Sequence, residues 1–134
     1  MNVTPHFTLE EFKCHDGTDY PLSFLDRLQK LCGALETIRS KVNAPITILS
    51  GYRTLAHNAA VGGAGQSQHC EGRAADITVD GWHAHDVHDL ILKLYQDGQI
   101  QIGGLGRYDG WTHVDVREND DGHLSRWEGP HEGK

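Results

Sequence analysis

The sequence predicts an α+β domain in which a small antiparallel sheet carries helices packed on one face. Three observations support this prediction: a long amphipathic helical pattern, a compact run of β-branched residues, and two late strand-like runs joined by a turn signal. The chain has 134 residues, which is enough for one domain with its own hydrophobic core. Because neither a repeat nor a linker divides it, we expect a single domain over residues 1–134.

The strongest helical pattern lies between residues 22 and 42. Its apolar side chains recur at spacings of three and four, at Leu25, Leu28, Leu31, Leu35, Ile38 and Val42. Pro45 follows closely, so the helix is expected to end near Asn43. A second long helix is predicted over residues 82–96, with Gly98 just beyond its end.

Two shorter helices are also expected. Thr8 and Glu11 have the spacing of a capping box, and Phe7 and Phe12 are placed for a hydrophobic staple around it. Residues 56–61 form the other short helical segment, and a glycine-rich loop follows at residues 62–65.

The predicted sheet contains Ile46–Ser50, residues 75–79 and a C-terminal hairpin of residues 103–108 and 111–116. Asp109 and Gly110 join the hairpin strands and are typical of a type I′ turn. The long helix should cover one face of this sheet. In the polar tail that follows Glu118, only Leu124 and Trp127 are suited to dock on the domain.

Composition excludes several functional classes. The net charge is −7, so a nucleic acid or an anionic membrane surface is not expected as a partner. The chain contains no apolar run of membrane-spanning length and no visible signal peptide, which predicts synthesis and retention in the cytoplasm unless another process releases the protein. The three cysteines, Cys14, Cys32 and Cys70, are expected to be free thiols of a reducing compartment.

A candidate metal site is formed by side chains from two distant stretches. His69 and Asp76 lie seven residues apart around a glycine and two alanines, and His113 comes much later. Catalytic zinc usually takes three protein ligands and keeps a fourth position for water. These three residues would supply that set. Strand alternation also places Asp115 on the same face as His113.

Several segments together resemble the M15 family of zinc D-alanyl-D-alanine carboxypeptidases, which share a fold with the hedgehog signalling domain. The resemblance covers about residues 7–127 and is greatest to the compact subfamily that includes cell-wall peptidases and phage lysins. It is carried by Pro45-Ile-Thr-Ile-Leu-Ser-Gly-Tyr-Arg-Thr, His57-Asn58, Val61-Gly-Gly-Ala, Ser67-Gln-His, Gly72-Arg-Ala-Ala-Asp and Thr112-His-Val.

The resemblance implies roles for individual residues. It assigns zinc binding to His69, Asp76 and His113, and it gives Arg53 a role in orienting the substrate or polarising the scissile carbonyl. From the residues alone, Arg53 would have been interpreted as an exposed charge after a core strand.

The general base is less directly indicated. The family places a carboxylate three residues before the last zinc ligand, where this chain has Gly110. Asp109 is one position further back, and a one-residue bulge would bring it into register. Asp115 is the alternative base, although it would equally serve as a hydrogen-bond partner that orients His113.

The implied function is zinc-dependent hydrolysis of amide bonds in peptidoglycan stem peptides, with carboxypeptidase and endopeptidase activity both left open. The alternative is a non-catalytic, zinc-stabilised binding module of the hedgehog-like fold. A monomer is expected. Release by phage lysis or carriage in a virion would bring the protein to the cell wall. A chromosomal enzyme that recycles wall peptides and a fragment of a longer protein remain alternative contexts.

Overall fold

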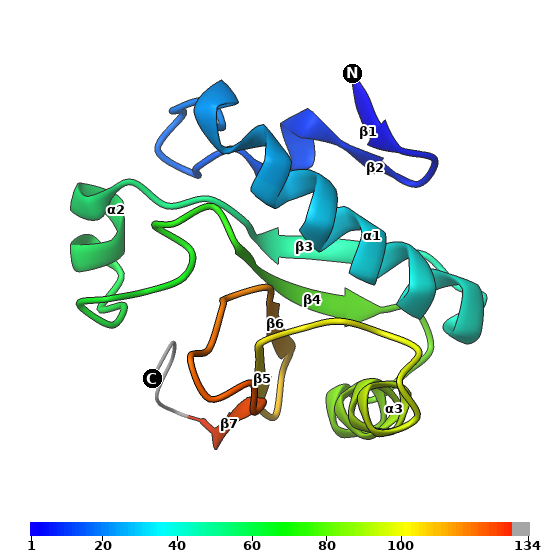
Figure 1. The fold of residues 1–134 in the computed structure, drawn as a ribbon. Coiled ribbons are helices and arrows are strands. Elements are labelled where there is room, and N and C mark those ends of the chain that lie inside the picture. Colours follow the sequence, from blue (N-terminus) through cyan, green and yellow to red (C-terminus); the bar gives the residue numbers. More distant parts are fainter. Residues whose placement is uncertain (130–134) are drawn as a thin grey trace.

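A computed structural model describes residues 1–129 of the chain. Its centre is a five-stranded sheet in the order β3-β4-β6-β5-β7, with α1 and α3 as the two long helices (Figure 1). The strands are β3 (Ile46–Ser50), β4 (Ala74–Val79), β5 (Gly104–Arg107), β6 (Thr112–Asp115) and β7 (Ser125–Glu128). The α+β prediction is therefore confirmed.

The sheet is mixed. β3, β4, β6 and β5 pair antiparallel with their neighbours, as predicted, but β7 adds to β5 in parallel. The parallel edge strand β7 was not predicted from the sequence, and it makes the sheet mixed. After β6 the chain reverses through a turn near Gly122, and Asn119 donates hydrogen bonds to the carbonyl oxygens of Gly103 and His123. These bonds hold the turn beside Gly103, so β7 begins next to the first residue of β5. From there the two strands run in the same direction, with Ser125 opposite Gly104 and Glu128 opposite Arg107.

The long helix α1 (Leu25–Val42) is preceded by one turn of 3₁₀ helix, η2 (Leu22–Phe24). Together they cover the predicted range. The helix ends at Asn43, which has the left-handed backbone conformation (φ 50°) that allows such a termination. The second long helix, α3 (Ala84–Gln96), begins two residues later than predicted because the His83 side chain accepts a hydrogen bond from the His85 N–H and caps it.

The short elements match the predictions closely. Phe12 ends a 3₁₀ helix, η1 (Leu9–Phe12), and both hydrogen bonds of the predicted capping box between Thr8 and Glu11 form. A two-stranded ribbon of β1 (Asn2–Thr4) and β2 (Phe7–Thr8) precedes it, a feature that the sequence pattern did not predict. The short helix α2 (Leu55–Ala60) follows β3.

The connection between β5 and β6 differs from the predicted two-residue turn. The strands pair continuously from Gly104 opposite Asp115 to Arg107 opposite Thr112, so residues 108–111 form a four-residue loop without a bulge in the paired strands. Neither central residue is among those with positive φ, which a type I′ turn requires. Tyr108 and Trp111 stack at 4.5 Å between ring centroids and close this wider loop.

Alternation along the central strands separates the core from the polar face of the sheet. Ala75, Ile77 and Val114 are buried in one hydrophobic cluster with side chains of α1 and α3. The intervening residues Asp76 and His113 therefore lie on the opposite face. Within residues 1–129, no helix combines the length and apolar character needed to cross a membrane. All three cysteines are free thiols, as predicted.

Candidate metal centre

His69 is held in the loop that enters β4. Its backbone N–H bonds to the Ser67 hydroxyl, and its carbonyl oxygen accepts from the Arg53 N–H at 3.1 Å. Its ring Nδ1 donates to the Gly51 carbonyl oxygen at 2.7 Å. These bonds tie the loop to the end of β3 and fix the imidazole, with Nε2 directed towards Asp76.

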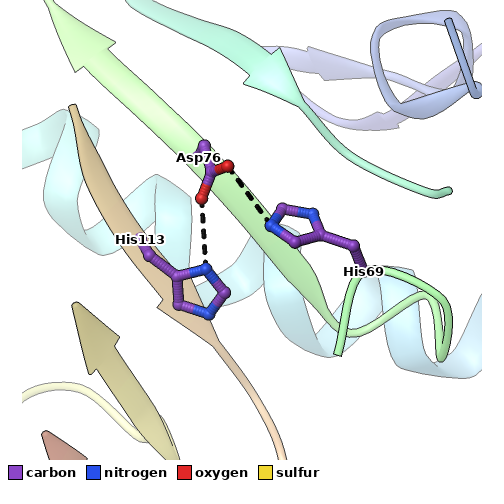
Figure 2. Close-up of side chains that lie close together, drawn as sticks. All are labelled: His69, Asp76 and His113. Atoms are coloured by element: carbon purple, nitrogen blue, oxygen red, sulfur yellow. Dashed lines mark hydrogen bonds and ion pairs between the residues drawn. The ribbon is translucent and has the colours of Figure 1, made fainter. Parts of the chain in front are cut away.

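Asp76 and His113 are direct cross-strand partners on β4 and β6. Figure 2 shows how the carboxylate of Asp76 lies between the two imidazoles. Its Oδ2 atom is 3.3 Å from Nε2 of His69, and its Oδ1 atom is 3.1 Å from Nδ1 of His113. Both histidines are fully buried and Asp76 is 5 % exposed. The structure thus brings together all three predicted ligands.

The geometry of this cluster fits a zinc ion. One ligand atom from each residue can be chosen so that all three lie within 4.8 Å of one another. Two ligand atoms bound tetrahedrally at about 2.0–2.1 Å are about 3.3–3.4 Å apart. The nitrogen–oxygen distances of 3.3 and 3.1 Å, one to each oxygen of Asp76, are close to this value. Two imidazoles and a carboxylate are also a donor set that zinc commonly takes.

The far sides of both imidazoles are occupied by hydrogen-bond acceptors. His69 donates to the Gly51 carbonyl, and Nε2 of His113 donates to Oδ2 of Asp115 at 2.7 Å. In neutral imidazoles, these bonds leave the lone pairs of the other ring nitrogens directed into the cluster. Metal-binding histidines characteristically have such partners, which fix tautomer and orientation.

Asp115 is itself held by Arg117 and enclosed by glycine. Arg117 donates from Nε to Oδ1 at 2.9 Å and from Nη2 to Oδ2 at 2.7 Å. A Cβ at Gly104 would lie 2.2 Å from Oδ2 of Asp115, so only glycine leaves room for the carboxylate. The hydrogen bond predicted between Asp115 and His113 is present, and it places Asp115 behind the candidate ligand His113.

The electrostatic surroundings favour a positive charge between the carboxylates. Burial alone would raise the pKa of Asp76, but the charge of His69 and hydrogen bonds to both imidazoles hold it below its usual range. Burial would likewise lower the pKa of His113, yet hydrogen bonds to Asp115 and Asp76 raise it. In Asp115, burial is outweighed by the hydrogen bonds from His113 and Arg117, and the pKa is lowered. A bound divalent cation would take the place of the proton that this environment favours.

Arg53 lies against the cluster instead of being exposed. It is 6 % exposed, its Nη2 atom is 3.5 Å from Oδ2 of Asp76, and Nη1 donates to Oδ1 of Asn58 at 3.3 Å. The interpretation of Arg53 as an exposed charge is therefore wrong. A Cβ at Gly63 would lie 2.0 Å from Oδ1 of Asn58, so this glycine allows the loop to close over the arginine's partner.

Asp109 is placed apart from the three ligands. Its side chain is fully exposed in the loop between β5 and β6, and its Oδ1 atom lies 3.1 Å from Nε2 of His85. The bulge that would have moved it into register is absent from the continuous pairing of β5 and β6. Its assignment as general base stays a prediction.

Two side chains were not predicted from the sequence to lie near the cluster: Trp127, which contacts His113, and Arg117, which contacts Asp115 and Trp127. The Trp127 ring on β7 lies 4.9 Å from the imidazole of His113 and donates from Nε1 to the Tyr108 hydroxyl. The Arg117 guanidinium lies 4.9 Å from the Trp127 ring. Docking of Trp127 was predicted, but not its contact with the candidate ligand His113, because the parallel return of β7 has no local sequence signal.

Replacing Asp115 by asparagine is expected to weaken zinc binding by about 10–100-fold, the usual cost of losing an outer hydrogen-bond partner of a metal ligand. The amide keeps the shape of the side chain but lacks the negative charge that holds His113. Competition with a chelating indicator would measure the change. Asp120→Asn, on the exposed turn, is the control and should leave the affinity unchanged. Equal affinities in wild type and Asp115→Asn would contradict this role.

The mixed α+β fold and the buried His-Asp-His cluster together describe a class of protein: a small domain with a candidate metal centre on the polar face of its sheet. The Peptidase M15 family model matches residues 5–115, and the chain therefore belongs to this family of zinc-dependent peptidases. The match includes all three candidate ligands and ends before Arg117 and Trp127. A comparison with curated protein sequences finds no match.

Proposed function

We propose that this protein is a zinc-dependent peptidase that hydrolyses amide bonds in the stem peptides of bacterial peptidoglycan. The observation that carries the proposal is the buried group of His69, Asp76 and His113, in which the far nitrogen of each imidazole is held by an acceptor. Membership of the M15 family supports peptide hydrolysis. The peptidoglycan substrate is supported by the sequence resemblance to cell-wall peptidases.

In this proposal His69, Asp76 and His113 hold the zinc ion. When bound, zinc lowers the pKa of its water ligand to about 7 and polarises the carbonyl group of a substrate. Asp115 and the Gly51 carbonyl keep the two imidazoles in the orientation that binding requires. Arg53, anchored by Asn58 and Asp76, would present its guanidinium to the negative charge that develops on the substrate oxygen.

A carboxylate is also needed to accept the proton of the attacking water and pass it to the leaving amine. Asp109 remains our candidate for this base. Its loop would have to bring the carboxylate away from His85 and towards the substrate for this role. Asp115 is the alternative, but its bonds to His113 and Arg117 favour an orienting role.

The surroundings in which the protein acts are also part of the proposal. We expect a monomer that acts on the wall peptide and binds neither nucleic acid nor membrane, in keeping with its net charge of −7. Synthesis in the cytoplasm followed by phage lysis, or carriage in a virion, would give it access to peptidoglycan. The genes that adjoin its own would test this context: a holin or tail gene is expected, and a chromosomal recycling operon would contradict it.

The activity is tested by incubating zinc-loaded protein with purified peptidoglycan and identifying released peptides by mass spectrometry. Wild type should cleave the stem peptide, and His69→Ala should not. Asp109→Ala should lose activity by about 10²–10⁴-fold, the usual contribution of a general base, while retaining zinc. Retained activity in Asp109→Ala would remove Asp109 from the mechanism but leave the peptidase in place.

Arg53→Lys provides an independent test of the charge-stabilising role. Lysine keeps the charge but not the planar group held by Asn58 and Asp76, so kcat should fall by about 10²–10³-fold with zinc still bound. Unchanged kcat would contradict the role.

The second candidate function is a zinc-stabilised binding module without catalytic activity. The exposed position of Asp109 is the observation that favours it. In that case the protein would bind one zinc ion per chain and leave every peptide bond of the purified peptidoglycan intact.

A further inference from the structure

A groove with a volume of 400 Å³ lies between the helix α3 and the edge strand β7. This volume is within the range of sites that bind small molecules. None of the three candidate metal ligands lines the groove. Its lining consists of His88, Arg107, Leu124, Arg126, Trp127 and Glu128.

The strand register places this groove on the face of the sheet that α3 covers. Arg126 on β7 pairs with Leu105 on β5, and Leu105 is buried in the hydrophobic core together with side chains of α3. Arg107, two residues further along β5, lies on the same face because side chains alternate along a strand. The candidate metal ligands are on the opposite face of the sheet, so the groove is a separate site.

Two guanidinium groups can reach one ligand in this groove. Neighbouring strands lie about 4.8 Å apart and a strand rises about 3.3 Å per residue, so the backbone positions of Arg107 and Arg126 are about 8 Å apart. Long side chains span that separation. Arg126 is exposed, and its side chain has no hydrogen-bond or ion-pair partner among residues 1–129. Its charge is therefore available to a ligand.

Arg107 is held in place but keeps donors for a ligand. Its Nη2 atom donates to Nδ1 of His85 at 3.1 Å, and its Nη1 atom lies 3.9 Å from Oε1 of Glu128. A guanidinium has five N–H donors in a fixed plane, so these two contacts leave others unused. The arginine is thus oriented before a ligand binds.

His88 adds a buried imidazole to the two arginines. The residue is only 6 % exposed, and its Nδ1 atom donates to Oδ1 of Asp89 at 3.0 Å. The Nε2 atom on the other side of the ring has no hydrogen-bond partner among residues 1–129, yet it is not one of their fully buried atoms. Because the ring lines the groove, a ligand there can reach this nitrogen.

The charges of the groove favour an anion, although the whole chain has a net charge of −7. Two arginines line it against one carboxylate, that of Glu128, whose side chain is 74 % exposed. The donors come from three directions: His88 from α3, Arg107 from β5 and Arg126 from β7. A tetrahedral phosphate presents oxygens in such directions, whereas the two oxygens of a carboxylate lie in one plane. Guanidinium groups also match phosphate geometry well.

The imidazole favours a terminal phosphate over a phosphodiester. Asp89 accepts the proton of Nδ1, so a neutral His88 presents the Nε2 lone pair to the groove and can accept from a phosphate hydroxyl. A protonated His88 would instead donate to a phosphate oxygen. A diester has no hydroxyl and can use only the second arrangement. Beyond these polar groups, Leu124 and Trp127 supply apolar surface for the organic part of a ligand.

We propose that the groove between α3 and β7 binds a small phosphomonoester. Its terminal phosphate lies between Arg107, Arg126 and His88, and its organic part packs on Leu124 and Trp127. The proposal does not depend on the peptidase function, because no candidate metal ligand takes part in it.

Isothermal titration calorimetry of the zinc-loaded wild-type protein tests the ligand class with three probes: glycerol 3-phosphate, inorganic phosphate and dimethyl phosphate. Glycerol 3-phosphate should bind at one site per chain and more tightly than inorganic phosphate. Dimethyl phosphate should bind at least about tenfold more weakly, the effect of one hydrogen bond to a charged group. Equal or tighter binding of either inorganic phosphate or dimethyl phosphate would overturn the assignment, as would no binding of glycerol 3-phosphate.

A matched pair of variants tests the location of the site. Arg126→Gln should weaken glycerol 3-phosphate binding by about tenfold, because it removes a charged donor without leaving a partner unpaired. Lys41→Gln removes the same charge from an exposed position at the end of α1 and should bind as wild type. Zinc content should be unchanged in both variants. Equal affinities of wild type and folded Arg126→Gln would overturn the proposal.

His88→Gln provides an independent check on the imidazole. It should weaken binding of glycerol 3-phosphate and reduce its advantage over dimethyl phosphate, because the shared hydrogen bond at Nε2 is lost. A preference for the monoester that is unchanged in this variant would remove His88 from the site and contradict the assignment to a terminal phosphate.

Discussion

Replacing Asp76 by asparagine is expected to abolish stoichiometric zinc binding and peptidase activity together. Asp76 lies between both imidazoles and contributes the negative charge of the ligand set. Removing an outer partner of a metal ligand already costs about 10–100-fold in affinity, so loss of the ligand's charge should cost at least about 100-fold. Zinc per chain after gel filtration, measured by mass spectrometry of the metal, gives the result directly.

The matched control for this variant is Asp80→Asn, which changes an exposed carboxylate just after the same strand. It should keep one zinc ion per chain and full activity. Circular dichroism of both variants establishes that the fold is retained. Full zinc content in folded Asp76→Asn would show that Asp76 is not a ligand.

Replacing Phe12 by alanine is expected to lower the free energy of unfolding by about 3–5 kcal/mol, the range for truncation of a buried phenylalanine. The Phe12 side chain is fully buried and contacts the Phe7 ring edge-on at 6.4 Å between centroids. Its carbonyl oxygen accepts from the Tyr52 N–H, beside the glycine that holds His69. Urea denaturation followed by tryptophan fluorescence measures the loss.

Leu22→Ala serves as the control because this leucine is 68 % exposed. Its effect on unfolding should stay within about 0.5 kcal/mol. A loss below 1 kcal/mol in Phe12→Ala would contradict the assignment of Phe12 to the core. Both proteins should be compared with zinc saturated, because a bound metal adds its own contribution to stability.

The fold could be predicted from the sequence wherever the local pattern of apolar residues matches the face that the element buries. The apolar spacing of α1 and the β-branched run of β3 each specify one element and one buried face. Two central strands then decide the site: alternation in β4 and β6 places Asp76 and His113 opposite the core side chains Ile77 and Val114. The candidate ligands could be named from the sequence because their spacing is also part of the pattern that carries the family resemblance.

The remaining features depend on contacts that no local pattern records. Stacking of Tyr108 on Trp111 opens the predicted two-residue turn into a four-residue loop and leaves Asp109 beside His85. The parallel pairing of β7 brings Trp127 onto His113 from a polar tail in which no strand was predicted. Burial of Arg53 likewise depends on Asn58 and Asp76, which lie five and 23 residues away in sequence.

The central claim is that one zinc ion is held by His69, Asp76 and His113. X-ray absorption at the zinc edge of the loaded wild-type protein tests it most directly. The account predicts imidazole nitrogen and carboxylate oxygen ligands at about 2.0–2.2 Å. A sulfur ligand at about 2.3 Å would place a cysteine on the metal and contradict the assignment, as would a shell without imidazole nitrogen.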